Sequence, residues 1–80
     1  MNEIKVTSLN SLTMGDVFTM SGNGPYVALN VRSGEGQPTV VEYRQFRNGL
    51  PRGTVSQFYR AGLTTVTVLD RFYGPELYQY

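Results

Sequence analysis

Residues 16–31 read DVFTMSGNGPYVALNV, and this stretch decides the fold class. Two apolar segments flank Ser21-Gly22-Asn23-Gly24, in which Gly and Asn tolerate the positive φ that a tight hairpin turn needs. Side chains of a strand alternate between its two faces, so residues two apart share a face. We expect two strands, 16–20 and 26–31, joined as a β-hairpin; their inward side chains are Phe18, Met20, Val27, Leu29 and Val31.

The rest of the chain repeats this pattern of short segments punctuated by Gly and Pro, and no segment keeps a helical period. Further strands are expected at 3–7, 39–45, 54–60 and 64–69. A loop or short helical turn spans 8–16, where Asp16 caps the Gly15 turn; a polar loop spans 32–38 and a long turn spans 46–53. In 39–45, Val41 and Tyr43 point inward and Glu42 and Arg44 outward. A β-bulge is expected between Val55 and Phe58, which fall on opposite faces.

The 80 residues form one all-β domain, and strands of this length close most naturally into a small barrel that leaves no exposed edge. We expect the barrel over residues 1–70 and an aromatic tail over 71–80. The tail either packs over the barrel and contributes side chains to its hydrophobic core, or it inserts into a partner protein or a second copy of the chain. Its candidate interface residues are Phe72, Tyr73, Tyr78 and Tyr80.

The chain has no Cys and no His, which excludes thiol nucleophiles, disulfides, Cys/His zinc sites and imidazole acid–base catalysis. Its carboxylates show no spacing typical of a catalytic pair. The glycines at 22–24 and 34–36 lack the Lys-Ser/Thr pair and the helix of a phosphate-binding loop. We therefore expect no catalytic residue, no metal site, no cofactor and no enzymatic activity.

Arginines and aromatic residues interleave between positions 43 and 60. If 39–45 pairs with 54–60, three of the arginines gather at one end of the hairpin. Arginine with aromatic residues serves phosphate and base recognition, and it is equally the composition of protein-interface hot spots. Ordinary surface arginines are the third interpretation. The candidate partner- or phosphate-binding residues are Arg44, Arg47, Arg52, Arg60, Tyr43, Phe46 and Tyr59.

Two stretches carry a resemblance to a known group of proteins. The first is Leu9-x-x-Leu12-x-x-Gly15-Asp16-Val17-Phe18, followed by Gly24-x-Tyr26-Val27. The second is Gly53-x-Val55-x-x-Phe58, followed by Val66-x-Val68-Leu69-Asp70. Together they resemble small SH3-like β-barrel accessory proteins of bacteriophages, over residues 9–70. The resemblance implies a five- to six-stranded SH3-like barrel that binds and modulates a host protein.

Two other functions stay open. One is binding of nucleic acid or a nucleotide through the Arg/Tyr patch, although a net charge of +1 does not favour non-specific phosphate binding. The other is self-assembly, as a homo-oligomer or virion component, through the tail or an edge strand. No apolar run approaches the ~20 residues of a membrane span, and no signal peptide is recognisable, so no membrane contact and a cytoplasmic location in the host cell are expected.

Overall fold

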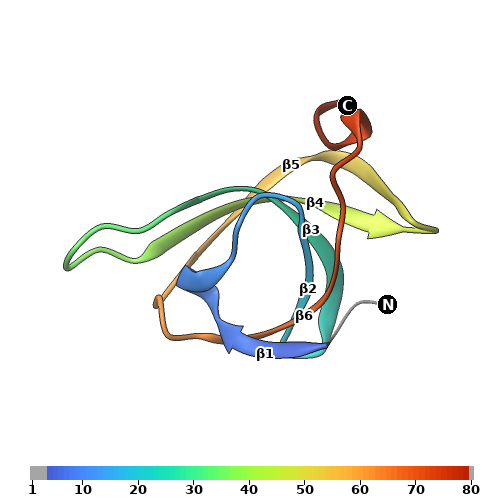
Figure 1. Cartoon of the computed structure of the whole chain (residues 1–80). Helices are drawn as coiled ribbons and strands as arrows, with labels where there is room; N and C mark the ends of the chain where they lie inside the picture. Colours follow the sequence, from blue (N-terminus) through green and yellow to red (C-terminus); the bar gives the residue numbers. More distant parts are fainter. Residues whose placement is uncertain (1–3, 80) are drawn as a thin grey trace.

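A computed structural model describes residues 4–79 and is all-β, as expected (Figure 1). Apart from two 3-10 turns, these residues contain no helix, and therefore none long enough to span a bilayer. The elements follow the chain as β1 (Lys5–Ser8), η1 (Leu9–Ser11), β2 (Asp16–Met20), β3 (Asn23–Arg32), β4 (Thr39–Arg47), β5 (Leu50–Arg60), β6 (Thr65–Arg71) and η2 (Pro75–Tyr78).

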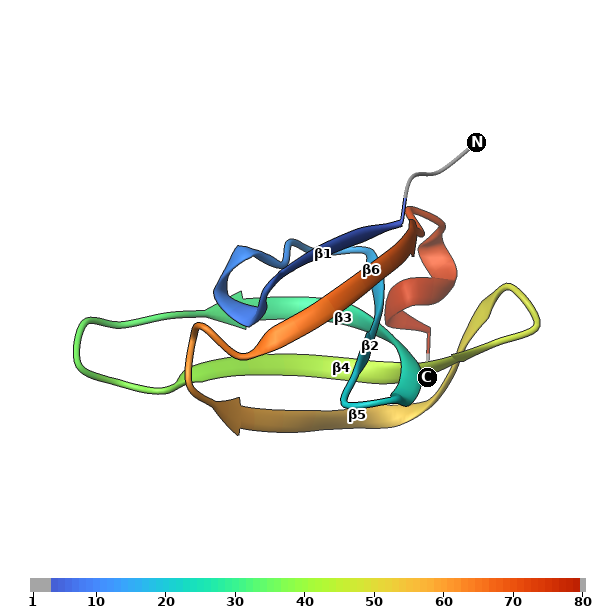
Figure 2. The ribbon, with the colours of Figure 1, turned by 90° about the horizontal axis from the view of Figure 1, so that it is seen from below.

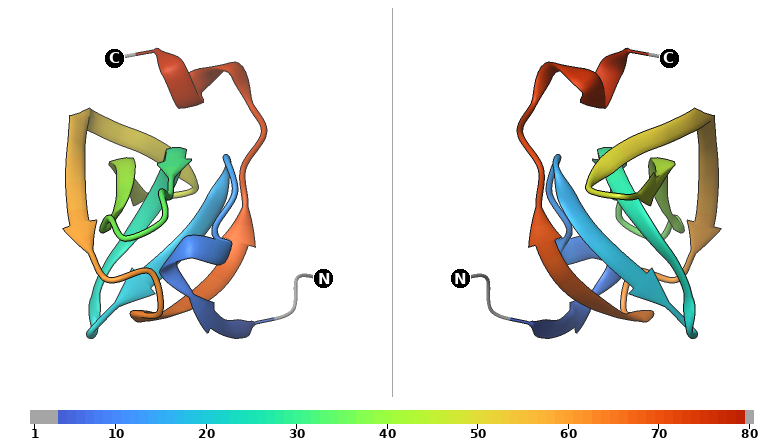
Figure 3. Two further views of the ribbon diagram at one scale, coloured as in Figure 1. Left: turned by 90° about the vertical axis from the view of Figure 1, so that its left-hand side faces the viewer. Right: turned by 90° about the vertical axis from the view of Figure 1, so that its right-hand side faces the viewer.

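The six strands form one antiparallel sheet in the order β1-β6-β2-β3-β4-β5. Figure 2 shows β1 and β5 at opposite margins, and Figure 3 shows how strongly the sheet curls between them. The expected closed barrel is wrong: the hydrogen-bonded ladder stays open between β1 and β5. Closure would require β1 and β5, the two ends of the strand order, to pair with each other, but within residues 4–79 β1 pairs only with β6 and β5 only with β4.

Two hairpins turn on only two residues each. The predicted β2–β3 hairpin turns at Ser21-Gly22, with φ of 52° and 77°, and β3 already begins at Asn23. The expected long turn over 46–53 is instead the pair Asn48-Gly49, with φ of 54° and 76°. Both pairs have the positive φ values of a two-residue turn that matches strand twist, so β4 and β5 extend further than predicted.

The first expected strand begins at residue 3, which lies outside the described residues; β1 itself starts at Lys5. Asp16 closes the turn before β2 as predicted, because its Oδ2 accepts a hydrogen bond of 2.9 Å from the Thr13 amide. The predicted 32–38 loop begins one residue later, because β3 includes Arg32, and a turn separates β5 from β6 between the predicted strands 54–60 and 64–69.

Both faces of the curled sheet carry a core. The inner face holds Phe18, Met20, Ala28, Val41, Val66 and Val68, capped by Leu9 and Leu12. The outer face holds Val17, Val27 and Leu29, covered by Leu77 from η2. Because Val17 precedes Phe18 and Val27 precedes Ala28, consecutive apolar residues serve opposite faces.

Bulges decide which face each residue joins. In β3 the register shifts between Ala28 and Asn30, so Val31 packs on the inner core while Leu29 belongs to the outer one. A bulge in β5 was predicted between Val55 and Phe58, but the register shift lies between Arg52 and Ser56, opposite Tyr43 and Gln45, so it includes Val55 and ends before Phe58. Val55 and Phe58 do lie on opposite faces, because each face has its own core.

Candidate functional site

The register of β4 against β5 sorts the candidate residues by face. Directly paired residues of antiparallel strands carry their side chains on the same side. The pairs with odd β4 numbers are Thr39 with Arg60, Val41 with Phe58, Tyr43 with Ser56, Gln45 with Arg52, and Arg47 with Leu50. Val41 and Tyr43 contact the inner core, so all these pairs belong to the inner face. The structure therefore brings four predicted residues to one face: Tyr43, Arg47, Arg52 and Arg60.

Three aromatic rings form the centre of this surface. Tyr43 and Phe58 stack with ring centroids 4.1 Å apart and planes at 8°. Tyr26 from β3 meets both rings edge-on, at 4.8 Å and 5.2 Å. All three are half-buried, with the buried Phe18 behind them. We call Tyr26, Tyr43 and Phe58, together with Arg47, Arg52 and Arg60, the aromatic–arginine face.

The arginines of this face have no carboxylate partner within residues 4–79. The ion pairs of that part of the chain join Arg32 to Glu42 and Arg71 to Asp16. Arg60 instead places its guanidinium 5.6 Å from the Phe58 ring centre and donates to the Tyr59 carbonyl at 2.9 Å. The aromatic–arginine face is therefore cationic, although the whole chain carries a net charge of only +1.

Arg44 points away from the inner face as predicted, but it is not the exposed ligand-binding residue that the sequence suggested. Its side chain is buried, with 3% relative exposure, because even-numbered positions of β4 point to the outer face and the C-terminal segment covers that face. Its Nε donates to the Gly53 carbonyl at 2.8 Å, and its Nη1 donates to the carbonyls of Glu76 and Leu77 at 2.7 and 3.1 Å. Arg44 thus fastens the tail to the sheet and leaves no open guanidinium for a ligand.

Two further predicted residues lie on the outer face, away from the aromatic–arginine face. Phe46 packs edge-on against Phe72 with centroids 5.7 Å apart. Tyr59 is exposed, and its hydroxyl donates to Oε1 of Gln57 at 2.6 Å. The expected single Arg–aromatic patch is therefore divided between the two faces of the hairpin.

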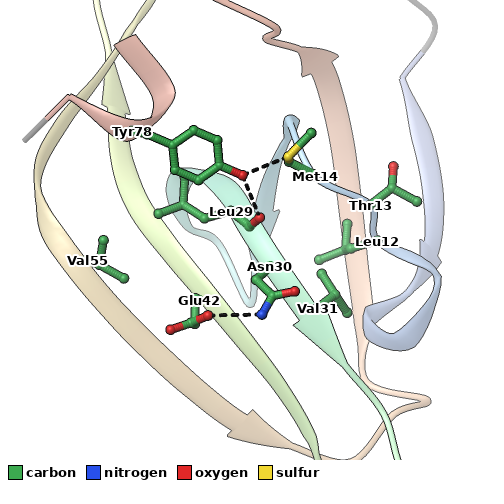
Figure 4. Close-up of a pocket in the computed structure, with 9 residues that line it drawn as sticks. All are labelled: Leu12, Thr13, Met14, Leu29, Asn30, Val31, Glu42, Val55 and Tyr78. Atoms are coloured by element: carbon green, nitrogen blue, oxygen red, sulfur yellow. Dashed lines mark hydrogen bonds between the residues drawn. The ribbon is translucent and has the colours of Figure 1, made fainter. Parts of the chain in front are cut away.

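A groove of about 610 Å³ opens on the outer side of β3 and β4 (Figure 4). One wall is Tyr78 of η2, whose hydroxyl lies 2.7 Å from Sδ of Met14 and 3.3 Å from the Leu29 carbonyl. The lining residues are Leu12, Thr13, Met14, Leu29, Asn30, Val31, Glu42, Val55 and Tyr78.

The carboxylate of Glu42 in this groove is already occupied. It accepts hydrogen bonds of 3.1 Å from Asn30 and from Arg32, and one of 3.4 Å from Gln57. The hydrogen bonds from Asn30 and Gln57, with the charge of Arg32, lower the pKa of Glu42. A carboxylate held ionised and saturated in this way is poorly suited to proton transfer near neutral pH.

The tail residues separate into packed and exposed ones. Phe72 is half-buried against Phe46, whereas Tyr73 is 70% exposed and Tyr78 54% exposed. Tyr80 lies outside the described residues. Sequence reasoning missed Leu77, which packs in the outer core. Leu77 is the only aliphatic residue after Leu69, and this could have indicated that it is buried.

Sequence reasoning also missed Tyr26 and Phe58 as site residues. Phe58 is recognisable afterwards by its spacing of two from Arg60, which places both side chains on one face. Residues 4–79 hold no group of three or more acidic residues placed to bind a metal ion. Comparisons with protein-family models, with curated proteins and with solved structures find no match.

Proposed function

We propose that this chain is a non-catalytic binding module whose aromatic–arginine face docks onto a protein partner. The observation that supports this best is a half-exposed aromatic cluster flanked by three arginines that have no carboxylate partner within residues 4–79. Interface hot spots are enriched in Tyr and Arg, because both give a large contact area together with directed hydrogen bonds. Such a surface gains more from burial against a partner than an ordinary charged surface does.

A protein partner fits the ring geometry better than nucleic acid does. Single-stranded nucleic acid binds by stacking its bases on open aromatic faces. Here Tyr43 and Phe58 stack on each other, and Tyr26 closes against both. One face of Tyr43 and one face of Phe58 are thus already occupied within the cluster, which favours a peptide surface over stacked bases.

We also propose that the curled sheet is an SH3-like barrel left open at one seam. Strands β2 to β5 run as a meander, and β6 returns to lie beside β2, which supports this arrangement. A bacteriophage accessory protein that binds and modulates a host protein is the role that the sequence resemblance implies for such a module.

Affinity capture from bacterial lysate tests the proposal. The wild-type chain is expected to retain a stoichiometric protein partner. The triple variant Arg47→Ala/Arg52→Ala/Arg60→Ala should retain about tenfold less of that partner, because removing a hot-spot residue can cost about 2 kcal/mol or more of binding free energy. Lys5→Ala/Arg32→Ala is the matched control, which removes two positive charges outside the face and should retain the partner. Equal capture by the triple variant, or no partner at all, would contradict the proposal.

Size exclusion with light scattering separates the other functions. A monomer of 9.0 kDa that changes size only with lysate supports protein binding. A shift with oligonucleotides in low salt but not in high salt would favour phosphate recognition by the arginines. An oligomer of the isolated chain would favour self-assembly through the open edges of β1 and β5.

A further inference from the structure

We infer that the partner of this module presents an extended acidic segment, which adds to the sheet as a strand along the free edge of β5. The inference rests on the proposed function and specifies the partner of the same face. Its starting point is the open seam of the sheet, where β5 ends the strand order without a neighbour on its outer side.

The outer edge of β5 offers unpaired backbone groups. The strand is 11 residues long, and beyond its ladder with β4 no backbone hydrogen bond links positions 54–60 to another part of residues 4–79. In an edge strand, alternate N–H and C=O groups point outward and form a template for pairing. Peptide recognition by strand addition uses such an edge for affinity and the flanking side chains for specificity.

The side chains along this edge define the charge of the added strand. Residues 50–60 contain Arg52 and Arg60 and no carboxylate. Glu42 of the adjacent strand β4 lies on the opposite face and is paired with Arg32. An acidic residue in the added strand on the inner face therefore meets an arginine that has no competing carboxylate in the described chain.

The distance between the arginines predicts the spacing of the acidic residues. Arg52 and Arg60 lie opposite Gln45 and Thr39, so six residues of β4 span the distance, while the bulge absorbs the two extra residues of β5. At roughly 3.3 Å per residue the two positions are about 20 Å apart. An added strand therefore needs two carboxylates six residues apart; an even spacing keeps both on the inner face, and an odd spacing turns one away.

A second copy of this chain is a poor occupant of the same edge. If two β5 strands paired antiparallel about Gln57, Arg52 of each copy would face Arg60 of the other, because Gln45 and Thr39, their partners in β4, each lie three positions from Glu42, the partner of Gln57. Like charges directly opposite one another destabilise a strand pair. The charges of the edge thus oppose self-pairing and favour an acidic partner.

NMR titration of the full chain with capped peptides of about twelve Thr and Gln residues provides the test. One peptide carries two Glu six residues apart, the second carries them five apart, and the third has Gln at both positions. At low salt we expect the first to bind about tenfold more tightly than the third and about threefold more tightly than the second. Shifted amides should concentrate at 54–60, and Arg52→Gln/Arg60→Gln should remove the differences while retaining the dispersed spectrum of the folded chain.

Each contrary outcome has a separate meaning. Equal affinity for the acidic and neutral peptides would overturn the acidic partner but leave strand addition and the proposed function in place. Binding of a twelve-residue oligothymidine in preference to the acidic peptide would overturn the inference in favour of nucleic acid. If no peptide perturbs residues 54–60 while the wild-type chain still captures a lysate protein through the three arginines, strand addition is wrong and the proposed function stands.

Discussion

Arg44 shows how one side chain fixes the position of a distant segment. Its guanidinium, with five N–H donors in a rigid plane, reaches carbonyls of both β5 and η2. The sequence placed it outward by alternation, and the alternation was correct, because Arg44 does face away from Val41 and Tyr43. The prediction failed because strand periodicity does not reveal that a later segment will cover that face.

Replacing Arg44 should destabilise the fold. Arg44→Met keeps a similar apolar stem but leaves three carbonyl groups without their charged donor, so we expect a loss of about 2–4 kcal/mol. Arg44→Lys should recover only part of this loss, because an ammonium group does not reproduce the planar fork. Urea denaturation followed by circular dichroism measures the change. Arg47→Ala, at an exposed position of the same strand, should stay within about 0.5 kcal/mol of wild type.

Glu42 gives a prediction about pH. Hydrogen bonds from Asn30 and Gln57 lower its pKa in the folded chain. A carboxyl group whose pKa is lower when folded stabilises the fold above its unfolded pKa, and the stabilisation is lost as the pH falls through the folded pKa. Asn30→Ala should therefore move the pKa of Glu42 upward, towards its ordinary value. Carbon-13 NMR of the side-chain carboxyl follows this titration, and an unchanged midpoint would show that Asn30 does not set it.

At the scale of elements, the 3-10 turn η2 completes the outer core. Leu77 is buried against Val17, Val27 and Leu29, and η2 contacts β3 and β5. The sequence identified the tail as a packing or interface segment through its aromatic residues. The aliphatic Leu77 does the packing, because a short turn presents only one side chain inward, whereas Tyr73 remains in solvent.

Leu77→Ala should therefore cost about 2–4 kcal/mol, the range for removing a buried leucine that leaves a cavity. Thermal or urea unfolding measures it, and hydrogen exchange should show faster exchange at β3 amides near Leu29. Tyr73→Ala removes a larger but exposed side chain of the same segment and serves as the control, with little expected change. A similar cost for both variants would mean that the tail contributes through its overall bulk.

At the scale of the whole molecule, the sequence predicts strand positions well and their assembly less well. The all-β class, β2 and the β2–β3 hairpin follow from alternation and turn residues, both of which are local. The strand order is not local: β1 lies beside β6, which comes some sixty residues later, and no local pattern encodes that contact or the absence of pairing between β1 and β5 in the described residues. The candidate site is limited in the same way: Tyr43, Arg47, Arg52 and Arg60 share one face, whereas Arg44, Phe46 and Tyr59 lie on the other, and the sequence does not reveal that the tail covers that second face.

The place of β6 between β1 and β2 has a consequence for the order of events during synthesis. Strands β2 to β5 are consecutive neighbours in the sheet, and all four are synthesised before β6. β1 is synthesised before the other five strands, yet it has no strand to pair with until β6 is made some sixty residues later. Because contacts distant in sequence close large loops, they form late and slowly. β1, the earliest of these six strands in the chain, is thus among the last of them to join the sheet.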